Sequence, residues 1–229
     1  MKKLLKCAFV NTIPVMMGYL VLGFGFGIIS QKNGYGIIWA AAMSIFIYAG
    51  SMQYVAVSLL TSGASLITTA ITTLMVNARH LFYGITMIEP YKKAGKKKPY
   101  LIFGLTDETY SLLCSGKAPE GLDFHKYSFF VTLFNQIYWI AGSMLGVLAG
   151  TLITFNTAGV DFAMTALFIT IFVDQWRSTK NHLPAIIGVL ASIVCLIIFG
   201  SDDFLIPTMT VITLILSLGR KHMDRQEEA

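Results

Sequence analysis

Charge is what this sequence has least of. Only 13% of its 229 residues are charged, whereas 55% are hydrophobic, and the mean hydropathy is +0.67. A soluble domain of this length needs a larger charged surface, and no polar stretch is long enough to fold as a separate soluble domain. The composition therefore predicts an all-α polytopic integral membrane protein, with residues 1–229 forming a single transmembrane domain.

The sequence also lacks the patterns of common enzymes and metal sites. Its three cysteines, Cys7, Cys114 and Cys195, lie far apart with no CxxC or Cys/His spacing, so neither a metal nor a cofactor is predicted. No Walker A, GxSxG or HExxH motif occurs, so no catalytic residue is assigned. The net charge of +5 does not indicate nucleic acid, because in a membrane protein the position of basic residues matters more than their sum.

Apolar segments fill most of the chain. We expect helical segments over 8–30, 36–61, 65–87, 100–115, 127–153, 161–176, 183–200 and 203–219. Three lysines precede the first segment, which is too long for a signal peptide and has no small-residue cleavage site. We interpret it as a retained helix.

The basic residues predict a topology. If the N-terminus is cytoplasmic and every segment crosses, the loop Glu89–Pro99 with its five lysines lies outside, against the positive-inside rule. We therefore predict that 36–61 and 100–115 enter the membrane and return, which leaves about six crossing helices and both termini in the cytoplasm. In the alternative topology every segment crosses. It differs from the first only in the side of the membrane on which two loops lie.

The middle of segment 36–61 has small and polar residues, AGSMQ, that can break a helix. Free backbone groups at membrane depth are tolerated only where they are buried in protein or line a cavity. The N-terminus of a half-helix attracts a carboxylate and free carbonyls attract an ammonium, so a zwitterionic amino acid fits such a break. The substrate-binding residues predicted from this feature, and from the polar and proline positions of the first helix, are Ala49, Gly50, Ser51, Gln53, Asn11 and Pro14. A packing contact in an unbroken helix is the alternative.

Segment 65–87 carries ionisable residues near its end, in the sequence MVNARHLFYG. Such residues inside a membrane are functional candidates by default. A polar face runs along this segment through Thr69, Thr72, Thr73, Asn77 and His80. Arg79 points about 100° away from His80, with Tyr83 one turn beyond Arg79. We expect Asn77, His80 and Tyr83 to contact substrate.

Alternatives stay open for the two charged side chains of this motif. Arg79 has three possible partners, namely lipid headgroups, a buried carboxylate or a substrate carboxylate. His80 either relays protons or is a neutral structural histidine.

A pair of adjacent acids, Asp107 and Glu108, lies in LTDETY at the centre of segment 100–115. On a helix they point in different directions, so one can pair with Arg79 while the other faces a cavity. Acids at membrane depth are typical of proton relays, and we expect Arg79, His80, Asp107 and Glu108 to serve as an ion pair or in proton coupling. The alternative is an interfacial helix whose acids contact water.

Together these motifs resemble the AzlC family, which includes the YgaZ proteins. The resemblance rests on Pro14 followed by Gly18, AGSMQ, NARHLFY, TDETY and GVDFAMTALF (159–168), in this order along most of the chain. It implies a transporter of the bacterial cytoplasmic membrane that exports leucine, isoleucine and valine, with methionine as a further candidate. It also implies coupling to the proton-motive force and a separately encoded small membrane subunit of the AzlD or YgaH type.

Two other classes of function remain. One is an intramembrane enzyme that uses Ser51 with His80 or a pair of carboxylates. The other is a membrane assembly subunit without its own substrate path, in which the polar face of segment 65–87 docks a partner helix.

Overall fold

The computed structural model describes residues 2–152, 169, 172–173, 176–177, 181–204, 207–208, 210–212 and 214–216. The chain divides into two compact units, residues 1–165 and 166–229, which are treated separately below. The motif at 159–168, most of the predicted segment 161–176, much of 203–219 and the C-terminal tail lie outside the described residues.

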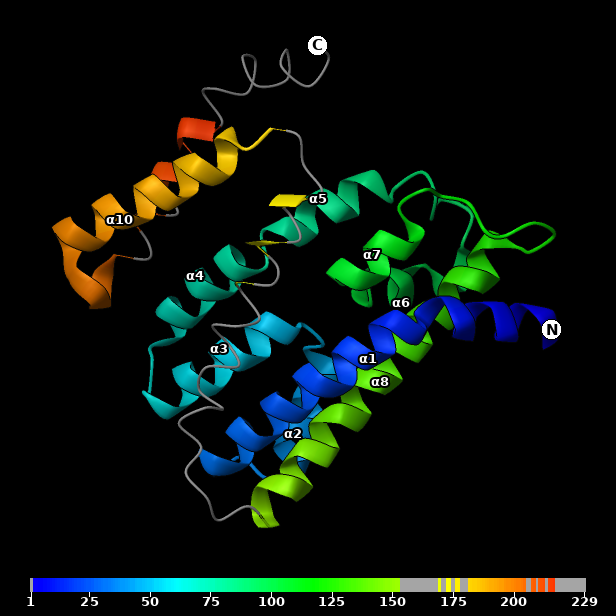
Figure 1. Cartoon of the computed structure of the whole chain (residues 1–229), viewed down its shortest axis with the longest axis horizontal. Coiled ribbons are helices and arrows are strands. Elements are labelled where there is room, and N and C mark those ends of the chain that lie inside the picture. Colours follow the sequence, from blue (N-terminus) through cyan, green and yellow to red (C-terminus); the bar gives the residue numbers. More distant parts are fainter. Residues whose placement is uncertain are drawn as a thin grey trace. The chain divides into compact units, whose positions relative to one another are not determined.

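Every regular element that the structure describes is helical, which confirms the all-α prediction (Figure 1). Within the described ranges, three helices are long and apolar enough to cross a membrane: α1, α8 and the part Leu183–Gly200 of α10. The elements are α1 (Lys2–Lys32), α2 (Ile37–Phe46), α3 (Gly50–Thr61), α4 (Leu66–Val76), α5 (Arg79–Thr86), the 3₁₀-helix η1 (Gly95–Lys97), α6 (Lys98–Phe103), α7 (Asp107–Leu113), α8 (Phe124–Leu152) and α10 (Leu183–Asp203).

The central feature of the first unit is a parallel pair of long helices, α1 and α8, which lie side by side in Figure 1. Their backbones approach closely because glycines face each other. A Cβ atom on Gly27 would collide with the Ser143 carbonyl oxygen, and one on Gly146 would collide with that of Phe24. Small residues allow this kind of contact between membrane helices. The helix α1 continues through Pro14.

Segment 36–61 folds as a hairpin of two short helices. The break lies at Ile47–Ala49 and so includes the first residue of AGSMQ. Within the break, Tyr48 has a φ of 45°, the one positive φ of a non-glycine residue that the structure describes. The hydroxyl of Thr61 at the end of α3 lies 3.3 Å from Oδ1 of Asn33 in the turn after α1. The segment therefore returns to the end of the unit from which it started.

Segment 100–115 is broken in the same way. The helices α6 and α7 are separated at Gly104–Thr106, and Gly116, after α7, packs against Pro90, which precedes α6. This hairpin also starts and ends at one side of the unit. One continuous helix over this segment is thereby excluded.

The sequence predicts one helix over 65–87, and this prediction is wrong. The helices α4 and α5 are separated at Asn77–Ala78, where the amides of His80 and Leu81 bond to the carbonyls three residues earlier. Such a tight 3₁₀ turn inside a helix often marks a functional hinge. The polar residues from Thr69 to His80 are therefore divided between two helices.

The lysine-rich loop lies at the same end of the unit as the N-terminus. A buried apolar cluster contains Ala8 of α1 and Tyr127 of α8. It also contains Tyr91 and Ala94 of the loop and Met87, which precedes the loop. The N-terminal lysines and the lysines at 92–98 thus gather at one end, whereas Lys32 follows α1 to the other.

We predict that Gly27→Ala lowers the thermal midpoint of the detergent-solubilised protein, because the added methyl group collides with the backbone of α8. Overpacking of this kind typically costs about 1–3 kcal/mol. Gly18→Ala is the matched control, since a Cβ there meets nothing within 4 Å. Equal midpoints for both variants and the unaltered protein would contradict the close α1–α8 contact.

Candidate functional site

Arg79 joins the starts of three short helices. It is the first residue of α5, and its Nη1 lies 2.9 Å from Oδ2 of Asp107, the first residue of α7. Its Nη2 donates a 3.0 Å hydrogen bond to Oγ of Ser51 in the first turn of α3. A protein carboxylate, one of the three partners considered for Arg79, is therefore in contact with it.

This contact leaves polar atoms unused. The side chains of Arg79 and Asp107 are about one-quarter exposed, yet Nε of Arg79 and Oδ1 of Asp107 are buried and have no hydrogen-bond partner in the part of the chain that the structure describes. Oδ1 of Asn77, at the hinge, is likewise buried without a hydrogen-bond partner among the described residues. Buried polar atoms are usually paired, so the two unpaired atoms of this ion pair are candidate contacts for a ligand or a water molecule. We refer to Ser51, Asn77, Arg79 and Asp107 as the Arg79 cluster.

Glu108 points away from the Arg79 cluster and into the bundle, as expected for the neighbour of Asp107 on a helix. Its Oε2 accepts a 2.6 Å hydrogen bond from the hydroxyl of Tyr19 on α1. The same hydroxyl lies 2.6 Å from Oγ1 of Thr106, which caps α7. Thr106 in turn bonds to Thr109, which accepts from Nδ2 of Asn135 on α8. A chain of polar side chains thus connects Glu108 to both long helices.

The tips of the two hairpins meet beside α8. The side chain of Gln136 donates to the Ile45 carbonyl near the tip of the first hairpin and accepts from the Tyr100 hydroxyl of the second. The ring of Tyr48 lies 6.1 Å from that of Phe103. The Tyr48 hydroxyl is buried and makes no hydrogen bond with the described residues. A strained backbone at a buried hairpin tip is typical of functional sites.

Gln53 holds the first hairpin against α8. It is fully buried, its Oε1 accepts a 2.8 Å bond from the Trp139 indole, and its Nε2 donates to Ser44. Gly50 faces the same indole, at a distance where a Cβ would lie 3.0 Å from the ring. Both residues were predicted to bind substrate, and their contacts here are with the protein.

His80 and Tyr83 form an aromatic group next to the hinge. The rings of Tyr83 and Tyr110 stack with centroids 4.4 Å apart, and the His80 ring meets Tyr83 edge-on. Nδ1 of His80 lies 3.2 Å from the Asn77 carbonyl. Ser51 accepts its hydrogen bond from Arg79, and the Ser51–His80 pair considered from the sequence has no hydrogen bond among residues 2–152.

Two predicted substrate residues lie apart from the Arg79 cluster. Asn11 donates to the Tyr127 hydroxyl in the apolar region near the start of α8, and Pro14 lies on an exposed face of α1. Ala49 precedes α3 as its N-cap, and α3 has no side-chain cap. Its first amide groups therefore keep their partial positive charge.

Sequence reasoning missed Tyr19, Ser44, Thr106 and Thr109. Tyr19 and Ser44 lie in apolar runs, and nothing in their spacing places them beside residues 108 and 53. Thr106 and Thr109 lie within TDETY, where an S/T-x-x-S/T pattern before a short helix could have indicated the cap.

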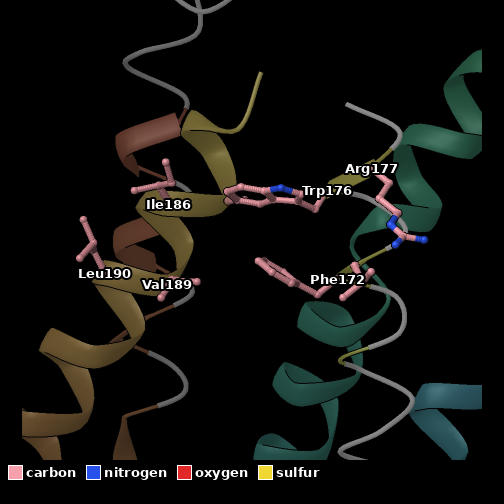
Figure 2. A pocket seen from close by; sticks show the side chains of 8 residues that line it. Phe172, Trp176, Arg177, Ile186, Val189 and Leu190 are labelled. Carbon is pink, nitrogen blue, oxygen red and sulfur yellow. The ribbon is translucent and has the colours of Figure 1, made fainter. Parts of the chain in front are cut away.

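The second unit contains an apolar pocket of about 460 Å³. Figure 2 shows Phe172 and Trp176 facing Ile186, Val189 and Leu190 across it, while Arg177 points elsewhere. No residue of the Arg79 cluster contributes to it. Its lining has almost no polar group to orient a ligand, so we do not assign a site to it.

The sequence comparison decides the family. The AzlC protein family matches residues 14–153. The chain belongs to the AzlC family. The matched region contains the Arg79 cluster and the polar chain from Tyr19 through Glu108 to Asn135. The resemblance stated from the motifs is confirmed.

Relatives of this AzlC-family chain cover nearly its whole length. The "Branched-chain amino acid transport protein AzlC" of Bacillus subtilis is 44% identical over 97% of this chain and 87% of its own length. An "Uncharacterized membrane protein" of Helicobacter pylori strain 26695 is 40% identical over 97% of each chain. The "Inner membrane protein YgaZ" of Escherichia coli is 23% identical over 80% of this chain and 78% of its own. No solved structure matches.

We predict that Gln53→Ala lowers the thermal midpoint, because the Trp139 indole and the Ser44 hydroxyl lose a buried partner. A buried group left without its hydrogen bond costs about 1–3 kcal/mol. Ser58→Ala, on an exposed position of the same helix, is the control and should leave the midpoint unchanged. A Gln53→Ala protein as stable as the control would show that Gln53 does not hold the hairpin.

Proposed function

We propose that this protein is a secondary transporter that exports branched-chain amino acids across the bacterial cytoplasmic membrane. Export is driven by the proton-motive force and requires a small membrane subunit of the AzlD or YgaH type. The Bacillus subtilis relative is named a branched-chain amino acid transport protein, which supports the substrate class. The substrates are leucine, isoleucine and valine, with methionine as a further candidate.

One observation carries the proposal: two broken hairpins bring their tips to the middle of a helical bundle, beside an arginine–aspartate pair with unused polar atoms. Broken helices at membrane depth are typical of substrate sites in secondary transporters, where free backbone groups face a polar ligand. A membrane assembly subunit has no need of such a pair in its interior.

The proposed roles follow from position. The uncapped start of α3, at Ala49, Gly50 and Ser51, attracts the substrate carboxylate together with Arg79. Asn77, His80 and Tyr83 border this place from α5 and its hinge. Gln53 supports the hairpin from behind, and Asn11 and Pro14 act from α1 at a greater distance.

Glu108 is proposed as the proton carrier. It is the acid that lies inside the bundle, bonded to Tyr19, while Asp107 is paired with Arg79. The two acids therefore have different proposed roles. Asp107 is compensated by a cation, whereas Glu108 is bonded to a hydroxyl that can also exchange a proton.

The end that carries the lysine-rich loop and the N-terminus is proposed to be cytoplasmic, following the positive-inside rule. Large apolar side chains stay exposed along α4 and α5, among them Leu66, Leu74 and Phe82. Lipid or the small subunit covers them.

Leucine counterflow in proteoliposomes, with the small subunit present, tests the function. We expect the unaltered protein to exchange labelled leucine and Arg79→Ala to reduce the rate at least about tenfold, since the change leaves Asp107 unpaired. Lys92→Ala, which removes an exposed ion pair with Glu89, should exchange normally. No exchange by the unaltered protein would remove the transporter assignment.

An imposed proton gradient should accelerate net leucine transport by the unaltered protein. In Glu108→Gln the proton gradient should no longer accelerate net leucine transport, whereas counterflow should persist. The reason is that the permanently neutral glutamine side chain cannot take up and release a proton. A gradient response that survives in Glu108→Gln would assign proton coupling to another residue.

A further inference from the structure

We propose that the amino acid binds by replacing the Arg79–Asp107 ion pair: its carboxylate takes Arg79, its ammonium takes Asp107, and the two side chains separate to admit it. This inference rests on the proposed function and adds the reason why the site accepts zwitterions. It assigns the two charges of the ligand to two residues from different helices.

The ion pair is built loosely for a structural one. A single contact joins Nη1 to Oδ2, while Nε of Arg79 and Oδ1 of Asp107 remain buried and unpaired within the described residues. A bidentate pair would use both. A ligand carboxylate can accept from the unused guanidinium donor, and a ligand ammonium can donate to the unused oxygen of Asp107.

The helices that carry the pair can move apart. Arg79 begins α5, a helix of eight residues, none of which is buried, and it follows the 3₁₀ hinge at Asn77–Ala78. Asp107 begins α7, which is fixed to the bundle through Thr109 and Glu108. Separation of α5 from α7 breaks the ion pair, the stacking of Tyr83 on Tyr110 and the hydrogen bond that the Thr86 hydroxyl donates to the Tyr110 hydroxyl.

Charge balance decides which ligands fit. The empty site holds one positive and one negative charge that compensate each other. A zwitterion supplies one charge of each sign, so two new pairs replace the old one and no charge is left alone. A ligand with a carboxylate but no amine would leave the charge of Asp107 uncompensated. A ligand with an amine but no carboxylate would leave the charge of Arg79 uncompensated. An unpaired charge at low dielectric is strongly unfavourable.

The test is a pair of opposite selectivity changes. Labelled leucine counterflow is measured with three competitors: leucine, 4-methylpentanoate, which lacks the amine, and 3-methylbutylamine, which lacks the carboxylate. In the unaltered protein leucine should compete best. Asp107→Asn leaves Arg79 without its charge partner, so the preference for leucine over 4-methylpentanoate should fall by roughly tenfold or more. Arg79→Gln should lower the preference over 3-methylbutylamine by a similar factor.

If either variant exchanges leucine too slowly, competitor binding to the purified variant is measured by ligand-induced thermal stabilisation. Glu89→Gln, which breaks the exposed pair with Lys92, is the control and should keep the unaltered selectivity. Variants that lose all ligands equally, or keep the unaltered selectivity, would overturn the exchange of ion pairs while leaving leucine transport by the unaltered protein as support for the function. Absence of leucine transport and binding in the unaltered protein would overturn both.

Discussion

A single guanidinium, that of Arg79, connects three parts of this structure. A partly buried charge without a partner is costly, and Arg79 is compensated by a carboxylate from α7 and a hydroxyl from α3. Arg79 and its two partners belong to three different short helices, and these three helices begin close to one another. The breaks at 47–49, 77–78 and 104–106 supply those beginnings. The costly residue and the broken helices are therefore parts of one arrangement.

The pair α1 and α8 provides the rigid support for that arrangement. Facing glycines bring the two backbones together, and side chains of both helices then hold the hairpins: Tyr19 holds Glu108, while Trp139 and Gln136 bind Gln53 and the tips. By contrast, α5 buries none of its residues. The Arg79 cluster thus joins hairpins held by α1 and α8 to a helix without a buried residue, and the proposed exchange of ion pairs uses this difference.

The sequence predicts the helical class, the family and the break at AGSMQ, because apolar length, ordered motifs and small residues at mid-segment are local signals. It does not predict the break at Asn77–Ala78, because neither glycine nor proline occurs there to indicate one. For Arg79 the sequence leaves three partners open, because the position of a residue around a helix gives the direction of its side chain but not the distance to a partner. Tyr19 could not be found at all, because 89 residues separate it from Glu108. The roles of the site residues in transport stay predictions.

The central claim is that segment 36–61 enters the membrane and returns, so that its broken tip reaches Arg79. Cysteines at positions 33 and 61, in a protein whose native cysteines are replaced, test it in membranes with a short bismaleimide cross-linker. The account predicts an efficient cross-link, because Asn33 and Thr61 are in hydrogen-bond contact, and labelling of both from the same side. If the segment crossed instead, the two cysteines would lie about 30 Å apart on opposite faces. Absence of the cross-link with labelling from opposite sides would contradict the account.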